Sequence, residues 1–306
     1  MTSFPINDPN DPVLMSLKES LGLNQPRPKS FYSPNTVHIP LIGSIVFVRD
    51  KQGIMMLSGI LAYWIYGVWS SYYVILQPHY EAGHIKAWFL YYHFIICVLC
   101  LVALFRASTQ NPGEVPHVTE EFAKQNKWEI CPTCGKWRPN KSHHCRRCQQ
   151  CVARMDHHCP WINNCVGEGN HYLFMQLLFY AFLFSTNTLI ALLSHFWVWP
   201  KCTSCDQESF PIKYGLWFSY LSFVMSIAMA GSMFSQFFAQ HFNLMMNRTT
   251  IDNMKINSPD DVDYSTLQIR SVLLSYSELC GTRRFYMWPW PCRGKRSSLL
   301  TGVSYA

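Results

Sequence analysis

Charged residues are scarce in this chain of 306 amino acids. Only 14% of the residues are Asp, Glu, Lys or Arg, whereas soluble domains average about 25%. The shortage is greatest in four apolar stretches that contain no residue of these four types: 54–76, 87–105, 172–199 and 215–238. Each is close to or above the ~20 residues that a helix needs to cross a bilayer. A large soluble core is the weaker interpretation, so the sequence predicts an all-α membrane protein with four transmembrane helices.

A secretory signal is also missing from the start of the chain. Residues 1–40 are polar, rich in proline and without an apolar core, which is unlike a signal peptide. We expect them to form a disordered cytosolic arm. Residues 41–53 should then lie in the membrane interface, and the first transmembrane helix should direct insertion itself.

Basic residues are distributed unevenly among the segments between the apolar stretches. Of the 25 Lys and Arg residues, 22 lie before residue 54, within 106–171 or after residue 238. The other three are Lys86, Lys201 and Lys213. Because basic loops stay on the cytosolic side, we expect both termini and 106–171 to face the cytosol. The net charge of +7 is then a consequence of membrane orientation and does not indicate nucleic-acid binding.

These expectations divide the chain into six segments. They are the arm 1–40, the interfacial segment 41–53, a transmembrane hairpin 54–105, a cytosolic cysteine-rich domain 106–171, two transmembrane helices within 172–240, and a cytosolic tail 241–306. The short lumenal loop between the last two helices contains Cys202 and Cys205. A disulfide and two free thiols are equally compatible with that pair, and a zinc site is less so.

The cysteine-rich domain has the residue spacing of a metal-binding segment. Seven of the thirteen cysteines lie between residues 131 and 165, together with four histidines. Cysteines two residues apart and His-Cys pairs direct soft ligands at one ion, and cytosolic thiols favour metal binding over disulfides. Two tetrahedral zinc ions need eight ligands, for which the candidates are Cys131, Cys134, Cys145, Cys148, Cys151, Cys165 and two of the histidines.

One cysteine of the segment, Cys159, is left over from this ligand count. It follows Asp156 and His157 closely, and a thiol with an imidazole and a carboxylate is the arrangement of nucleophilic catalysis. His157 would take the thiol proton, and Asp156 would hold the imidazole. Because adjacent side chains do not always face each other, we expect this short run to bend, with His158 bound to zinc.

The segment 131–174 resembles the DHHC cysteine-rich domain of the protein S-acyltransferases, or palmitoyltransferases. Asp156-His157-His158-Cys159 matches the family signature, and the Cys and His spacings agree with the family pattern through Asn170 and Phe174. The resemblance extends more thinly over residues 45–290, towards the small four-span members. It implies two interleaved structural zinc sites, one formed by Cys131, Cys134, His144 and Cys151, the other by Cys145, Cys148, His158 and Cys165. Spacing alone does not separate His143 from His144, and the resemblance favours His144.

The resemblance also implies a reaction. Cys159 would accept a long-chain acyl group such as palmitoyl from acyl-CoA and pass it to cysteines of membrane-associated substrate proteins. Trp161 would pack near the thioester and Thr250 would brace the catalytic Asp. Three residues match positions that meet the CoA phosphates, although a solvated basic run is an equally good interpretation: Arg138, Lys141 and His143.

The acyl chain would lie in a cavity among the helices or in the bilayer. Phe184 stands where the family sets chain-length preference, but we favour an ordinary packing or lipid-facing aromatic there. Asn111 replaces the Asp of the family's Asp-Pro-Gly, Asp252 replaces a Glu, and Ser275 aligns loosely with an Asn of the family's tail. The expected location is the Golgi or the endoplasmic reticulum, with the plasma membrane as a further possibility.

Three other functions compete with acyl transfer. A nucleic-acid-binding zinc finger is disfavoured by the four flanking membrane helices. A transporter would place more ionisable residues within the membrane than His93 and His195. A catalytically silent scaffold is disfavoured by the intact Asp156, His157 and Cys159.

Overall fold

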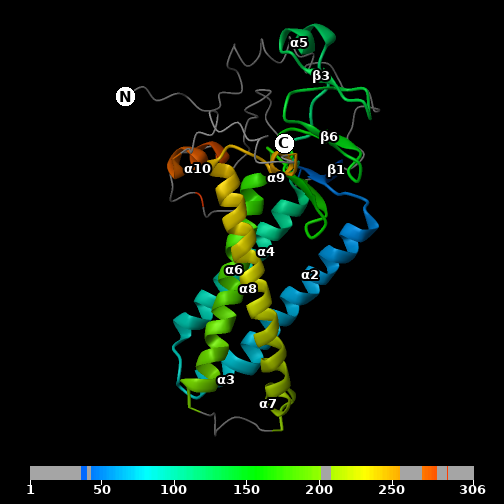
Figure 1. Cartoon of the computed structure of the whole chain (residues 1–306). Helices are drawn as coiled ribbons and strands as arrows, with labels where there is room; N and C mark the ends of the chain where they lie inside the picture. The colour runs from blue at the N-terminus through cyan, green and yellow to red at the C-terminus, as the bar shows by residue number, and fades with distance from the viewer. Residues whose placement is uncertain (1–35, 40–42, 201–207, 256–270, 281–287, 289–306) are drawn as a thin grey trace.

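The computed structural model describes residues 36–39, 43–200, 208–255, 271–280 and Trp288 (Figure 1). Four long helical segments form its frame, and each is long and apolar enough to cross a membrane. They are α2 (Lys51–Ser70) continued by the π-helix η2 (Ser71–Leu76) and by α3 (Gln77–Glu81), then α4 (Ala87–Thr109), α6 (His171–Trp197) and α8 (Gly215–Met245). The prediction of four membrane helices is confirmed, and the chain is a multi-pass membrane protein.

Short helices lie at the two ends of this bundle. They are α5 (Glu120–Gln125), α7 (Phe210–Lys213), α9 (Thr250–Met254) and α10 (Val272–Cys280). Figure 1 shows α5, α9, α10 and the strands at one end, and α3 and α7 at the other. The cysteine-rich segment between α4 and α6 is therefore joined to the membrane helices on both sides.

The strands of the described residues pair as four antiparallel hairpins. These are β1 (Thr36–Ile39) with β2 (Gly43–Val46), β3 (Glu129–Ile130) with β4 (Trp137–Arg138), β5 (His143–Cys145) with β6 (Gln150–Val152), and β7 (His157–Cys159) with β8 (Asn164–Val166). Three of these small hairpins lie in the cysteine-rich domain between α4 and α6. The mainly helical fold class is as predicted.

The hairpin β1–β2 occupies positions that we assigned to a disordered arm and an interfacial segment. Val46 and Val48 are buried, with 4% and 1% of their surface exposed, and they pack in one cluster with Val152 and Met155 of the cysteine-rich domain. The side-chain amide of Asn163 also donates to the carbonyl of Val48 at 2.7 Å. Packing on this domain therefore explains the hairpin. The rest of the predicted arm, residues 1–35 and residue 40, lies outside the described residues.

Buried polar side chains connect the membrane helices to one another. Nδ2 of Asn187 on α6 donates to Nδ1 of His93 on α4 at 2.7 Å, so Nε2 of His93 carries the proton that it donates to Oγ of Ser71 in η2 at 2.9 Å. Ser70 and Ser222 are 2.9 Å apart between their hydroxyls, which adds α8. Because a polar group in hydrocarbon needs a protein partner, these bonds stabilise one arrangement of the four helices.

The cysteine-rich domain contacts the end of α4 through a close approach of two backbone segments. The amide of Gly169 donates to the carbonyl of Pro112 at 3.0 Å, and a β-carbon on Gly169 would collide with the carbonyl of Asn111. Gly113 has a φ of 105°, a conformation that favours glycine. Oδ1 of Asn111 accepts from the amides of Gly113 and Glu114 at 2.9 and 2.8 Å, so Asn here supplies the acceptor that an Asp would supply.

We predict that Gly169→Ala lowers the melting temperature Tm of the detergent-purified protein by about 5 °C. Overpacking against backbone atoms costs about 1–3 kcal/mol, and about 1 kcal/mol shifts Tm by roughly 2–4 °C in a large domain. The matched control is Gly59→Ala on α2, because a β-carbon there has no neighbour within 4 Å among the described residues. Equal shifts in the two variants would show that this contact contributes nothing.

Candidate metal centres and active site

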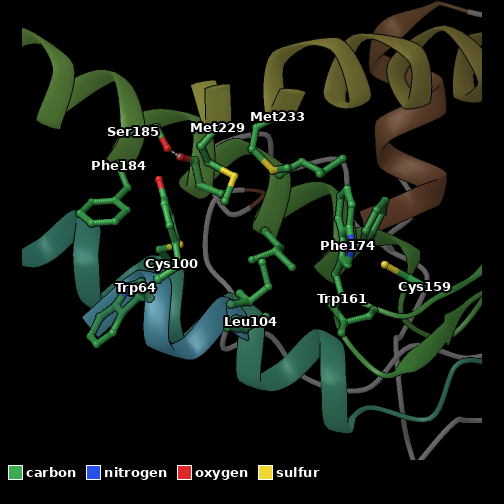
Figure 2. A pocket seen from close by; sticks show the side chains of 16 residues that line it. Trp64, Cys100, Leu104, Cys159, Trp161, Phe174, Phe184, Ser185, Met229 and Met233 are labelled. Carbon is green, nitrogen blue, oxygen red and sulfur yellow. Dashed lines mark hydrogen bonds between the residues drawn. The ribbon is translucent and has the colours of Figure 1, made fainter. Parts of the chain in front are cut away.

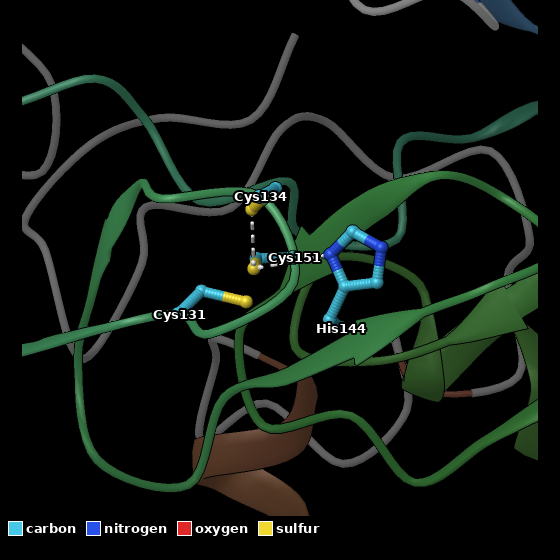
Figure 3. Close-up of side chains that lie close together, drawn as sticks. All are labelled: Cys131, Cys134, His144 and Cys151. Atoms are coloured by element: carbon cyan, nitrogen blue, oxygen red, sulfur yellow. Dashed lines mark hydrogen bonds between the residues drawn. The ribbon is translucent and has the colours of Figure 1, made fainter.

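The first predicted ligand set converges between β3, β5 and β6 (Figure 3). Its members are Cys131, Cys134, His144 and Cys151, whose ligand atoms all lie within 4.8 Å of one another. Sγ of Cys151 is 3.6 Å from Sγ of Cys134 and 3.7 Å from Nδ1 of His144. Zinc–sulfur and zinc–nitrogen bonds of ~2.3 and ~2.0 Å in a tetrahedron place the ligand atoms about 3.5–3.8 Å apart. The donor set therefore fits zinc, and it includes His144 instead of His143, as the resemblance favoured.

The second predicted set is also brought together. It consists of Cys145, Cys148, His158 and Cys165. Nδ1 of His158 lies 3.6, 3.4 and 3.7 Å from the three sulfur atoms, in the order of the residue numbers. A carboxylate oxygen of Asp50 is 3.7 Å from the other ring nitrogen of His158. These distances again agree with the edges of a zinc tetrahedron.

The strand register explains why the two clusters interleave. His144 on β5 is paired with Cys151 on β6, and His158 on β7 is paired with Cys165 on β8. Directly paired residues point to the same face of a hairpin, so each hairpin supplies a His and a Cys to one cluster. Cys145, which follows His144 on β5, belongs with Cys148 to the second cluster. The β5–β6 hairpin therefore contributes ligands to both clusters. Two bound ions would cross-link the small hairpins.

Two of the candidate catalytic residues, His157 and Cys159, lie on β7, and Asp156 directly precedes this strand. Side chains alternate along a strand, so His158 points to the second cluster while His157 and Cys159 share the opposite face. The Cys159 thiol is close enough to His157 to affect its affinity for a proton, and the ring of Phe174 packs edge-on against that of His157 with centroids 5.2 Å apart. The expectation of a bend in this run was wrong, because an extended strand already brings together residues two positions apart.

Asp156 is fully buried and accepts four hydrogen bonds from described residues. Oδ1 accepts from the amide of Thr250 at 2.7 Å. Oδ2 accepts from Nδ1 of His157 at 2.7 Å, from Nε2 of Gln240 at 2.8 Å and from Oγ1 of Thr250 at 2.9 Å. Burial alone would raise the pKa of Asp156, but the bond from His157 and the nearby positive charges hold it well below its usual range. The carboxylate is therefore ionised and fixes the His157 tautomer with its proton on Nδ1.

The environment of His157 suits it to accept a proton. Burial by itself lowers the pKa of His157, but its interactions with Asp156 and with the thiolate form of Cys159 raise it to about 9, so His157 can hold the proton that the thiol gives up. With Nδ1 bonded to the carboxylate, the other ring nitrogen is the one available to the Cys159 thiol. The site thus combines a thiol with an imidazole that is hydrogen-bonded to a buried carboxylate.

The remaining sequence-predicted residues fall into two groups. Thr250 donates a hydrogen bond to Asp156, and Trp161 lines a cavity together with Cys159. Arg138 makes an ion pair with Glu129 at 2.7 Å, and Lys141 is exposed. Burial lowers the pKa of His143, and the nearby cations Lys255 and Arg138 lower it further. CoA binding by these basic residues stays a prediction.

The cavity lies among the four membrane helices and is lined mainly by apolar side chains from α2, α4, α6 and α8. Figure 2 shows Cys159 and Trp161 at one end and Phe184, Trp64 and Cys100 at the other. Phe184 is 3% exposed and packs with Ile96 and Cys97, which agrees with the packing aromatic that we expected as one alternative, and it also lines the cavity. A β-carbon on Gly67 would lie 3.1 Å from its ring, which shows how closely α2 approaches this end.

Two residues of the site were missed by sequence reasoning. Gln240 lies beyond residue 238, where we ended the fourth apolar stretch, and His171 lies just before the third. Their side chains meet, with Nε2 of His171 2.9 Å from Oε1 of Gln240. No local motif marks either residue, because the contact joins positions 69 residues apart. Ser275, aligned with the family's tail Asn, is buried, and its hydroxyl has no hydrogen-bond partner in the part of the chain that the structure describes.

Comparison with known proteins agrees with this arrangement. The family model described as DHHC palmitoyltransferase matches residues 124–257, which include both clusters, β7 and Thr250. The chain belongs to the DHHC palmitoyltransferase family. It is similar to Palmitoyltransferase ZDHHC21 of Danio rerio, with 38% identity over 250 residues that cover 81% of this chain and 93% of the relative. The proteins of the same name from Homo sapiens and Mus musculus are 36% and 35% identical, over 82% of this chain and 94% of each relative.

We predict that the purified protein contains two zinc ions per chain by elemental mass spectrometry. Cys148→Ala should reduce this to about one, because it removes a ligand of the second cluster only. Cys280→Ala changes a cysteine of α10 outside both clusters and should keep two. Two bound zinc ions in Cys148→Ala would contradict the ligand assignment.

Proposed function

We propose that this protein is an S-acyltransferase that moves a long-chain acyl group, typically palmitoyl, from acyl-CoA to cysteines of membrane-associated proteins. One observation carries the proposal. The Cys159 thiol lies beside the His157–Asp156 pair and also at the end of the apolar cavity among the membrane helices. A nucleophile placed between a base and a space for a hydrocarbon chain suits transfer of a fatty acyl group.

The first half of the reaction forms an acyl-enzyme. His157 takes the proton of the Cys159 thiol, and the thiolate attacks the carbonyl carbon of the acyl-CoA thioester. The bond between that carbon and the CoA sulfur breaks, and the proton on His157 passes to the leaving CoA thiolate. Asp156 stabilises the imidazolium that exists between these proton transfers.

The second half returns the enzyme to its starting state. His157 takes the proton of a substrate cysteine, whose thiolate attacks the carbonyl carbon of acyl-Cys159. The bond to Cys159 breaks, and its sulfur recovers the proton from His157. One thioester replaces another in each half, so no redox cofactor or ATP is needed.

The cavity contributes position more than affinity. Transfer of hydrocarbon out of water gains about 0.8 kcal/mol per CH2, but the bilayer offers almost the same gain. The advantage of a cavity that ends at Cys159 is that the thioester carbon is held near the thiol, which raises the effective concentration of the reacting groups. Trp161, 40% exposed beside Cys159, would cover the thioester.

The two Cys3His clusters would hold structural zinc. All four coordination positions of each ion would be filled by protein ligands, so neither ion has a position for substrate. Zinc would supply rigidity to the hairpins, and His158 would anchor β7 between its two catalytic neighbours. Arg138, Lys141 and His143 would meet the CoA phosphates from the same domain, facing the cytosol of a Golgi or endoplasmic reticulum membrane.

We predict a hydroxylamine-labile mass increase of one palmitoyl group when the protein is incubated with palmitoyl-CoA, measured by intact mass spectrometry. Cys159→Ser should abolish the adduct, because the hydroxyl is far less acidic than the thiol, and should keep two zinc ions. Cys280→Ser should retain the adduct. A labile adduct in Cys159→Ser would exclude this nucleophile, and no adduct in the folded, zinc-loaded wild type would favour a silent scaffold.

We predict that Phe184→Ala shifts the preference for acyl-CoA towards longer chains. Loss of the ring at the far end of the cavity leaves room for about two more CH2 groups, so kcat/KM for stearoyl-CoA relative to palmitoyl-CoA should rise about three- to tenfold. Phe179→Ala is the control, because Phe179 is on the same helix but does not line the cavity. An unchanged ratio in Phe184→Ala would mean that this end does not limit chain length.

A further inference from the structure

Gln240 connects the fourth membrane helix to the catalytic carboxylate. It lies near the end of α8, is 7% exposed, and its amide nitrogen is 2.8 Å from Oδ2 of Asp156 and 3.2 Å from Oγ1 of Thr250. Its amide oxygen is 2.9 Å from Nε2 of His171, the first residue of α6. The side chain therefore contacts three elements at once: the strand region, the start of α6 and α9.

One arrangement of protons satisfies all these contacts. An ionised carboxylate only accepts hydrogen bonds, so the Gln240 amide must direct its nitrogen to Asp156 and its oxygen to His171. His171 must then donate from Nε2. The second amide proton goes to Oγ1 of Thr250, whose own proton goes on to Asp156. His171 thus orients Gln240, and Gln240 orients Asp156.

We propose that Gln240 is a positioning residue for acyl transfer, that His171 acts through it, and that the pair keeps Asp156 aimed at His157. The inference rests on the proposed function, because it assigns a role in that reaction. Oδ2 of Asp156 must bond Nδ1 of His157 for the other imidazole nitrogen to face Cys159. Gln240 and Thr250 hold the carboxylate in this rotation, so the end of α8 and the residues after it fix the geometry of the base.

The effect should appear in the chemical step and not in substrate binding. Gln240 does not line the cavity that contains Cys159, so its loss leaves the place for the acyl chain unchanged. Loss of the hydrogen bonds lets Asp156 and His157 leave the reactive arrangement. The turnover number kcat should fall while KM for palmitoyl-CoA stays the same, a pattern that a loss of substrate binding does not give. Because a loss of folded protein would also lower the apparent kcat, each rate is normalised to the folded, zinc-loaded fraction of the variant.

The test compares two variants of Gln240 in the full-length, zinc-loaded protein. Gln240→Met keeps the length of the side chain and removes both donors. The rate of acyl-Cys159 formation should fall about tenfold or more, as expected for a buried hydrogen bond to a charged group, with KM within about twofold of wild type. Gln240→Glu keeps the shape but turns a carboxylate towards Asp156, and should be slower still. If Gln240→Met does not fold, Gln240→Glu alone decides.

The matched control is Gln176→Met. Gln176 is also 7% exposed, lies on α6, and donates to the carbonyl of Trp288 instead of Asp156. Its acyl-enzyme rate should stay within about twofold of wild type. An equal loss in Gln176→Met and Gln240→Met would show that any buried Gln gives this effect, and would overturn the proposal.

The contribution of His171 is tested by a double-mutant cycle. His171→Phe should slow acyl-enzyme formation by releasing the Gln240 amide, and His171→Phe combined with Gln240→Met should be no slower than Gln240→Met alone. The rate of Cys159 alkylation by iodoacetamide should fall in the same order across these variants, which a purely structural role would not cause. Additive losses would separate His171 from Gln240 and overturn the relay.

This inference and the proposed function fail in different ways. An adduct that persists in Cys159→Ser removes the proposed function. An adduct that requires Cys159 but forms at the wild-type rate in folded Gln240→Met and Gln240→Glu removes this inference and leaves the proposed function intact.

Discussion

The side chains of β7 alternate between two faces, and the rest of the site depends on this alternation. His158 belongs to the second Cys3His cluster, so the strand cannot rotate without breaking that cluster. His157 and Cys159 are then held on the opposite face, next to each other and at the end of the cavity. A Cys3His cluster on one face of the strand can in this way position the residues on the other face, because residues that alternate along a strand share one backbone.

Two asparagine side chains of the cysteine-rich domain bind the end of α4 and thereby fix the position of β7 relative to the membrane helices. The last carbonyl groups of a helix have no donor within the helix. At the end of α4, Nδ2 of Asn164 on β8 lies 2.9–3.2 Å from the carbonyl oxygens of Ala107, Ser108 and Gln110. Asn170 links the carbonyl of Cys165 to that of Ala107 in the same way. The cysteine-rich domain is therefore attached to the helices around the cavity by buried bonds, which gives Cys159 a defined depth.

Local patterns predicted a large part of this arrangement. The four spans follow from runs without charge, and the six cysteine ligands and the spare Cys159 follow from spacings within 35 residues, where the chain itself keeps the groups close. The choice of His144 over His143 came from the resemblance to the family and not from spacing. The contacts that were missed join distant positions. Gln240 reaches Asp156 across 84 residues, Asn163 reaches Val48 across 115, and Phe184 faces the cavity because of how α2 and α6 pack. The contacts of Gln240 and Phe184 depend on how α8 and α6 are rotated about their axes. Apolar composition does not specify this rotation, because the cavity and the lipid accept the same side chains.

The most direct measurement is peptide-level mass spectrometry of the wild-type protein after a single turnover with palmitoyl-CoA in the absence of substrate protein. The structure predicts one acyl group, located on Cys159, with the eight ligand cysteines and histidines unmodified. An acyl group found on another cysteine, such as Cys280, with Cys159 unmodified would contradict the assignment of Cys159 as the nucleophile.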